Sequence, residues 1–135
     1  MVKKSENTSV IFGFFVAAGL LWLGVRLYWG GVVFPGVFEA LVLLVIAPVC
    51  EELFFRGFVQ DIIRSRLAYG LFGVSLANVV TSVLFACVHL FSWGAFHSFL
   101  VFFPSLAFGY VYDRTGRISF CVLLHALYNL NAFIV

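Results

Sequence analysis

The chain has 135 residues, of which 64% are hydrophobic and 10% charged, and its formal net charge is +2. Soluble domains are roughly 25% charged, so this composition excludes an ordinary soluble domain, a disordered chain and a nucleic-acid-binding protein, which needs a basic surface. An integral membrane protein remains. At about 20 residues per helical span, we expect an all-α, polytopic transmembrane helix bundle of about five spans.

The first predicted span lies near residues 9–29, because residues 7–25 contain no charged side chain. This run is too long for a cleavable signal peptide and lacks a small-residue cleavage site. Arg26, near its outer end, is expected either to pair with Glu39 or to extend to the membrane interface. Residues 1–37 are thus predicted to form an N-terminal tail and a first transmembrane helix.

Four further spans are expected after it, separated by short turns. The second lies near residues 36–58. A turn at residues 67–75 contains two glycines, which favour irregular backbone, and the third span follows near 76–92. The fourth and fifth are expected near 97–112 and 118–134.

The basic residues predict the topology, because cytoplasmic loops are rich in Lys and Arg. They lie at the N-terminus and near two of the turns: Lys3, Lys4, Arg64, Arg66, Arg114 and Arg117. The turns around residues 29–36 and 91–96 contain neither type, and Trp29 and Trp93 occupy them as interfacial aromatics do. We therefore expect the N-terminus inside and the C-terminus outside.

The three cysteines are not expected to form a disulfide framework. Cys50, Cys87 and Cys121 lie in apolar runs, their number is odd, and none is paired at motif spacing. We interpret them as small core residues.

Charged residues interrupt the second span, where a charge is costly and by default functional. Glu52 and Arg56 are four residues apart, so they share one helical face and can pair. Glu51 lies about 100° around the helix and has no local partner, which suits a carboxylate to proton transfer. Alternatively, all three are solvated charges at the cytoplasmic interface.

Two later spans contain further polar side chains. His89 lies late in the third span, and His125 and Asn129 share a face of the fifth span. Each histidine alone could be a hydrogen-bonded packing residue. At 1.5 Å per residue, however, Glu52 lies about 21 Å from Arg66, and His89 about 20 Å from the start of its helix. These polar residues can therefore share one layer of the bundle.

This ordered set resembles the CPBP family of intramembrane proteases, also called the Abi or CAAX-protease family. The family has three signatures on separate membrane helices: Glu-Glu-x-x-x-Arg, Phe-x-x-x-His and His-x-x-x-Asn. Here they correspond to Glu51-Glu52-x-x-x-Arg56, Phe85-x-x-x-His89 and His125-x-x-x-Asn129.

The resemblance implies that residues 38–135 form a CPBP-like catalytic core. It makes Glu51 the general base that activates a water, and His89 the residue that orients this water. His125 and Asn129 would stabilise the oxyanion, and Glu52 and Arg56 would form a structural pair.

The resemblance also implies an intramembrane glutamic endopeptidase that needs no metal and no other cofactor. Its expected partners are the lipid bilayer and a membrane-associated protein or peptide substrate, with no nucleic acid. The expected location is the prokaryotic cytoplasmic membrane.

Three other functions fit the same residues. One is a non-catalytic membrane module of the same fold, such as an immunity or scaffold protein. Another is a zinc hydrolase with ligands from Glu51, His89 and His125, a chemically admissible set. The Glu and His residues could also conduct protons, which would require a chain of this size to oligomerise.

Overall fold

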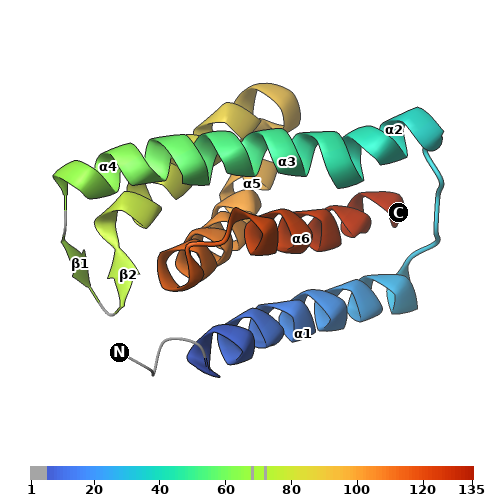
Figure 1. Cartoon of the computed structure of the whole chain (residues 1–135). Helices are drawn as coiled ribbons and strands as arrows, with labels where there is room; N and C mark the ends of the chain where they lie inside the picture. Colours follow the sequence, from blue (N-terminus) through green and yellow to red (C-terminus); the bar gives the residue numbers. More distant parts are fainter. Residues whose placement is uncertain (1–5, 68, 72) are drawn as a thin grey trace.

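The computed structural model describes residues 6–67, 69–71 and 73–135 and is an all-α helical bundle (Figure 1). Helix α1 (Glu6–Trp29) is followed by a long helix, here called the composite helix, because α-helical and wider π-helical turns alternate along it. Its parts are α2 (Val37–Leu41), η1 (Val42–Ile46), α3 (Ala47–Glu52), η2 (Leu53–Gln60) and α4 (Asp61–Arg66). A hairpin of β1 (Gly70–Leu71) and β2 (Val74–Ser75) then leads to α5 (Leu76–Thr115), α6 (Ile118–Asn129) and the short 3₁₀ helix η3 (Leu130–Phe133).

Helix α6 lies between α1 and the composite helix, and α5 passes behind it (Figure 1). The apolar core forms where α5 and α6 pack together. Its buried members are Phe108, Val111, Tyr112, Cys121 and Leu124, and α1 covers them with partly buried side chains such as Phe12 and Phe15. Because of this central position, α6 contacts α1, α5 and the composite helix.

Helix α5 changes direction at Gly94, where φ is 77° and ψ is 172°. Glycine adopts this left-handed backbone readily because it has no Cβ. The turn expected near residues 91–96 is thus a sharp kink at Gly94, which divides α5 into the apolar segments Leu76–Phe91 and Gly94–Thr115. Within the described ranges, the five helical segments are α1, the composite helix, the two halves of α5, and α6 with η3.

Most expected boundaries agree with the structure, with one correction. The composite helix continues to Arg66 rather than ending near residue 58, so Arg64 lies in its last turn and not in the loop. The third span begins at Leu76 as expected, where the Ser75 hydroxyl accepts a hydrogen bond from the Asn78 amide at 3.0 Å and caps the helix.

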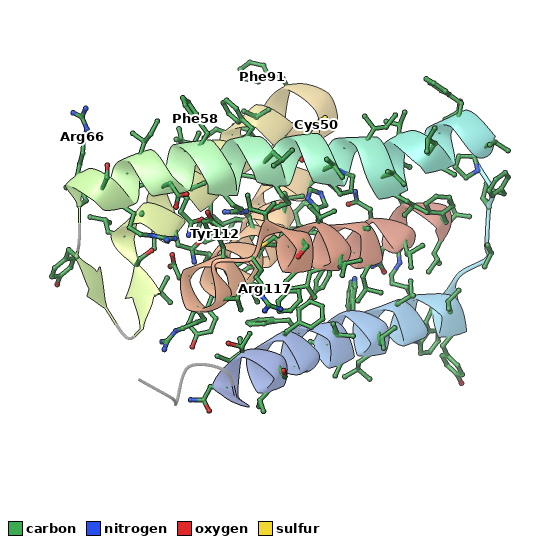
Figure 2. All side chains as sticks on the ribbon, in the orientation of Figure 1. Cys50, Phe58, Arg66, Phe91, Tyr112 and Arg117 are labelled. Carbon is green, nitrogen blue, oxygen red and sulfur yellow. The ribbon has the colours of Figure 1, made fainter. Side chains whose placement is uncertain are left out.

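The surface is apolar and much of the interior is polar. Fully buried side chains include Glu52, Arg56, Gln60 and Asn78. In contrast, Cys50 and Phe58 project from the outer face of the composite helix, and Phe91 lies 94% exposed on α5 (Figure 2). Apolar exposure of this extent is unfavourable in water and suits a surface that faces lipid.

Length and composition also agree with a membrane location for part of the bundle. Asn7–Trp29 and Gly94–Thr115 are long and apolar enough to cross a membrane. Leu76–Phe91 and Ile118–Phe133 are shorter apolar helices.

Charged side chains gather at the hairpin end of the bundle. Asp113 accepts hydrogen bonds from Arg64, from Gln60 at 2.9 Å and from Ser75 at 2.6 Å, and so joins three elements. The predicted inside residues Lys3 and Lys4 lie outside the described residues, as does the side chain of Trp93 among the interfacial aromatics. Trp29, at the opposite end of the bundle, is 82% exposed.

The structure corrects two smaller expectations. Cys121 is buried as predicted, but Cys50 and Cys87 are exposed, because their positions in apolar runs face outward from the bundle. Arg26 does not pair with Glu39; its guanidinium donates a hydrogen bond to the Ile134 carbonyl.

Candidate active site

The four predicted catalytic residues, Glu51, His89, His125 and Asn129, line a single cavity of about 760 Å³. They come from the composite helix, the first half of α5 and α6. A cavity of this volume is within the range of pockets that enclose small ligands. The structure thus brings together the residues that spacing alone placed in one layer.

A buried ion pair lies behind the cavity. The Arg56 Nε donates to Glu52 Oε2 at 2.9 Å, and both side chains are fully buried. Arg56 also donates to Ser105 Oγ at 2.7 Å and to Gln60 Oε1 at 3.3 Å. The alternative that these charges are solvated at the interface is therefore wrong. The pair joins the composite helix to α5.

His125 is held between the two adjacent glutamates. Its Nδ1 lies 2.9 Å from Glu52 Oε1, and its Nε2 lies 3.8 Å from Glu51 Oε2. Because an ionised carboxylate only accepts hydrogen bonds, Nδ1 is the donor to Glu52. Phe108 stacks on the ring with centroids 5.4 Å apart, which fixes its plane. The Nε2 atom is thereby directed toward Glu51.

Glu51 has an unsatisfied oxygen. Its Oε2 is buried and has no hydrogen-bond partner within the described part of the chain, since 3.8 Å from His125 is too long for a hydrogen bond. A buried oxygen of this kind is costly unless a water or a ligand satisfies it.

His89 is fixed by the phenylalanine of its own motif. Its Nδ1 lies 2.8 Å from the Phe85 carbonyl, and the two rings stack with centroids 4.5 Å apart. Because a carbonyl only accepts, Nδ1 carries the proton, and in the neutral ring Nε2 retains its lone pair as an acceptor. The four-residue spacing of Phe-x-x-x-His allows this contact within one helix.

The position of Asn129 depends on Pro48. In the π-helical turn η1, the Ala47 amide bonds to the Val42 carbonyl, and Pro48 has no N–H. The Leu43 carbonyl therefore loses both amides that could bond to it within the helix, and it accepts a hydrogen bond from Asn129 Nδ2 at 2.8 Å instead. π-Helical turns are frequent at functional sites, and this one orients the Asn129 amide.

Sequence reasoning did not assign two further residues of the cavity. His97 lines it from the second half of α5, and Arg26 lines it from α1. The signal for both was the presence of an ionisable side chain in or beside a predicted span, which is a functional indication by default.

The zinc alternative requires three ligands close together. Within the described ranges, no group of three or more His, Cys, Asp and Glu side chains is arranged to hold a metal ion. His125 directs its two nitrogens at the two glutamates instead.

Comparisons with known proteins agree with the signatures. The sequence model of the family described as "Type II CAAX prenyl endopeptidase Rce1-like" matches residues 33–131. A protein of Mycoplasma capricolum subsp. capricolum, described only as uncharacterized, is 32% identical over 94 residues, which cover 67% of this chain. The match covers 25% of that relative, so the chain spans about a quarter of the relative's length. No solved structure matches the chain significantly.

Proposed function

This chain belongs to the Rce1-like type II CAAX prenyl endopeptidase family, and we propose that it is an intramembrane endopeptidase of a membrane-associated substrate. The nucleophile in this proposal is a water activated by Glu51. The observation that supports it best is the buried Glu51 oxygen without a hydrogen-bond partner among the described residues, in a cavity shared with His89, His125 and Asn129.

The first step is attack by water. Glu51 removes a proton from the water while His89 Nε2 accepts a hydrogen bond from it, which directs the oxygen lone pair at the carbonyl carbon of the peptide bond. The carbonyl π bond opens and its oxygen becomes an oxyanion. Fixed donors in a site with little water stabilise such a charge strongly.

The donors to the oxyanion come from α6. His125 reaches the oxyanion through Nε2, because its Nδ1–H already bonds to Glu52, and it donates there when both ring nitrogens carry a proton. The Asn129 amide has two hydrogens, and Leu43 accepts one of them, so the second is free for the oxyanion. Glu52 and Arg56 act as positioning residues, since they hold His125 and do not face the substrate.

The intermediate then collapses. Its C–N bond breaks, the leaving nitrogen takes the proton held by Glu51, and the carboxylate is regenerated. No bond forms between enzyme and substrate, and no metal takes part. We propose the prokaryotic cytoplasmic membrane as the location, with the N-terminus in the cytoplasm and the C-terminus outside.

The test compares the wild-type protein with Glu51→Gln, which keeps the side-chain shape and removes the base. Each is reconstituted with membrane-protein extracts, and new peptide termini are identified by mass spectrometry. We expect termini that require Glu51, persist with a chelator and persist in the control Glu39→Gln, at an exposed position outside the cavity. Wild-type turnover by Glu51→Gln would contradict the mechanism, and chelator-sensitive turnover restored by Zn²⁺ would favour the zinc alternative.

A further inference from the structure

Arg26 is a cationic residue of the cavity lining that forms no ion pair with a carboxylate of the described residues. It is partly buried on α1 and lines the same cavity as Glu51. Its hydrogen-bond acceptor is the neutral carbonyl of Ile134. Within residues 6–67, 69–71 and 73–135, no carboxylate forms an ion pair with it.

Glu51 is not the counter-ion of this guanidinium. Among the described residues no ion pair joins the two side chains, and the group that faces Glu51 Oε2 is His125 Nε2 at 3.8 Å. A guanidinium has five N–H donors in a planar fork, of which the Ile134 carbonyl engages Nη2. An uncompensated charge in a protein interior or a membrane is costly, so this position favours binding of an anion.

The surroundings of Arg26 indicate what kind of molecule brings the anion. Trp22 lies one turn earlier on the same helix and also lines the cavity, and Leu100, Val101 and Phe103 line it from α5. The ligand is therefore largely apolar, with one negative group. The guanidinium fork matches the two oxygens of a carboxylate.

From this geometry we propose that Arg26 is the carboxylate-binding subsite of the enzyme and determines its specificity. An apolar peptide binds with a carboxylate on Arg26 while its peptide bond lies at Glu51. This inference rests on the proposed peptidase function. Arg26 precedes the region matched by the family, residues 33–131, so the comparison does not assign it.

The carboxylate could be the free end of the peptide or an acidic side chain, and three probes separate these sources. The probes are a dansyl-labelled apolar tetrapeptide acid, the same peptide as a C-terminal amide, and that amide with Asp as its last residue. Binding is measured by fluorescence anisotropy in a nonionic detergent, which excludes anionic lipid. Every variant contains Glu51→Gln, so that affinity is measured without turnover.

The acid, the Asp-ended amide or both should bind about tenfold more tightly than the plain amide, because charge-assisted hydrogen bonds are the stronger kind. Arg26→Gln should abolish this preference and leave the affinity for the plain amide unchanged, whereas Arg26→Lys should retain part of it. Arg66→Gln is the matched control, because Arg66 is an exposed arginine at the C-terminal end of the composite helix, outside the cavity (Figure 2). It should leave the preference unchanged.

Equal affinities for all three probes, or a preference that survives Arg26→Gln, would overturn the subsite. If Arg26→Gln fails to fold, the ratio of acid to amide affinity is measured in the Glu51→Gln protein, which retains Arg26. A ratio near one overturns the proposal, and a large ratio that falls with added salt supports it. Failure of the peptidase proposal is recognised separately, as absence of Glu51-dependent cleavage while the binding preference persists.

Discussion

Glu52 contacts two partners with its two carboxylate oxygens. One oxygen accepts from Arg56 and the other from His125. Spacing along one helix predicted the first contact, because residues four apart share a face. It could not predict the second, which joins residues 73 positions apart on different helices. The adjacent glutamates thus have different tasks: Glu52 holds His125, and Glu51 faces the cavity.

Removal of one member of the Glu52–Arg56 pair should cost more than removal of both, because the remaining member becomes an uncompensated buried charge. We expect Arg56→Leu alone to destabilise the protein by about 3–5 kcal/mol. Adding Glu52→Gln should restore part of this, since a Gln carbonyl can still accept from His125. Thermal unfolding in detergent of the two single variants and the double variant measures the coupling, and strictly additive losses would show that the residues do not pair.

At the scale of helices, α5 and the composite helix approach each other closely at Gly109. Gln60 donates to the Gly109 carbonyl at 3.2 Å. A Cβ at this position would lie 1.9 Å from Asn78 Oδ1 and 3.0 Å from Gln60 Oε1. The absence of a side chain leaves room for two buried polar residues, Asn78 from the first half of α5 and Gln60 from the composite helix.

Gly109→Ala should therefore destabilise the bundle, by about 1–3 kcal/mol or more on the scale of other overpacked interiors. The matched control is Gly24→Ala on α1, where nothing lies within 4 Å of the added Cβ; there, the higher helix propensity of Ala should leave stability unchanged or raise it. Melting temperatures in detergent measure both. An unchanged melting temperature for Gly109→Ala would mean that Asn78 and Gln60 can move away from the added Cβ without loss of stability.

Sequence periodicity and charge placement were enough to predict the helices and to place the polar residues of the second, third and fifth spans in one layer, because both depend on local spacing. Contacts between helices were not predictable in the same way. The outward-facing Cys50 and Cys87 lie in runs that are apolar on all sides, so the sequence does not distinguish lipid from core. The link from Pro48 through Leu43 to Asn129 requires a π-helical turn, which no spacing rule predicted.

At the scale of the whole molecule, the start of α1 and the C-terminus lie at opposite ends of the bundle. Helix α1 begins near the hairpin end, where Arg64 and Arg66 lie, and the C-terminus lies at the other end (Figure 1). An odd number of spans places the ends of a chain on opposite sides of a membrane. The arginine-rich end is expected in the cytoplasm.

A reporter fused after Val135 should therefore be active on the extracytoplasmic side. Alkaline phosphatase, which folds only outside the cytoplasm, and a fluorescent protein that folds in the cytoplasm form a matched pair. High phosphatase activity with low fluorescence is the expected result. The reverse pattern would mean that one of the helical segments does not cross the membrane.

A single turnover in H₂¹⁸O distinguishes a Glu51 that activates water from a Glu51 that bonds to the substrate. Excess enzyme is mixed with an intact peptide that it is known to cleave. After the reaction the enzyme is digested, and mass spectrometry measures the masses of the peptide product and of the enzyme fragment that contains Glu51. We expect one ¹⁸O atom in the new carboxylate of the product and none in Glu51. Heavy oxygen in the Glu51 side chain would show that this carboxylate attacks the substrate itself, and would contradict the mechanism.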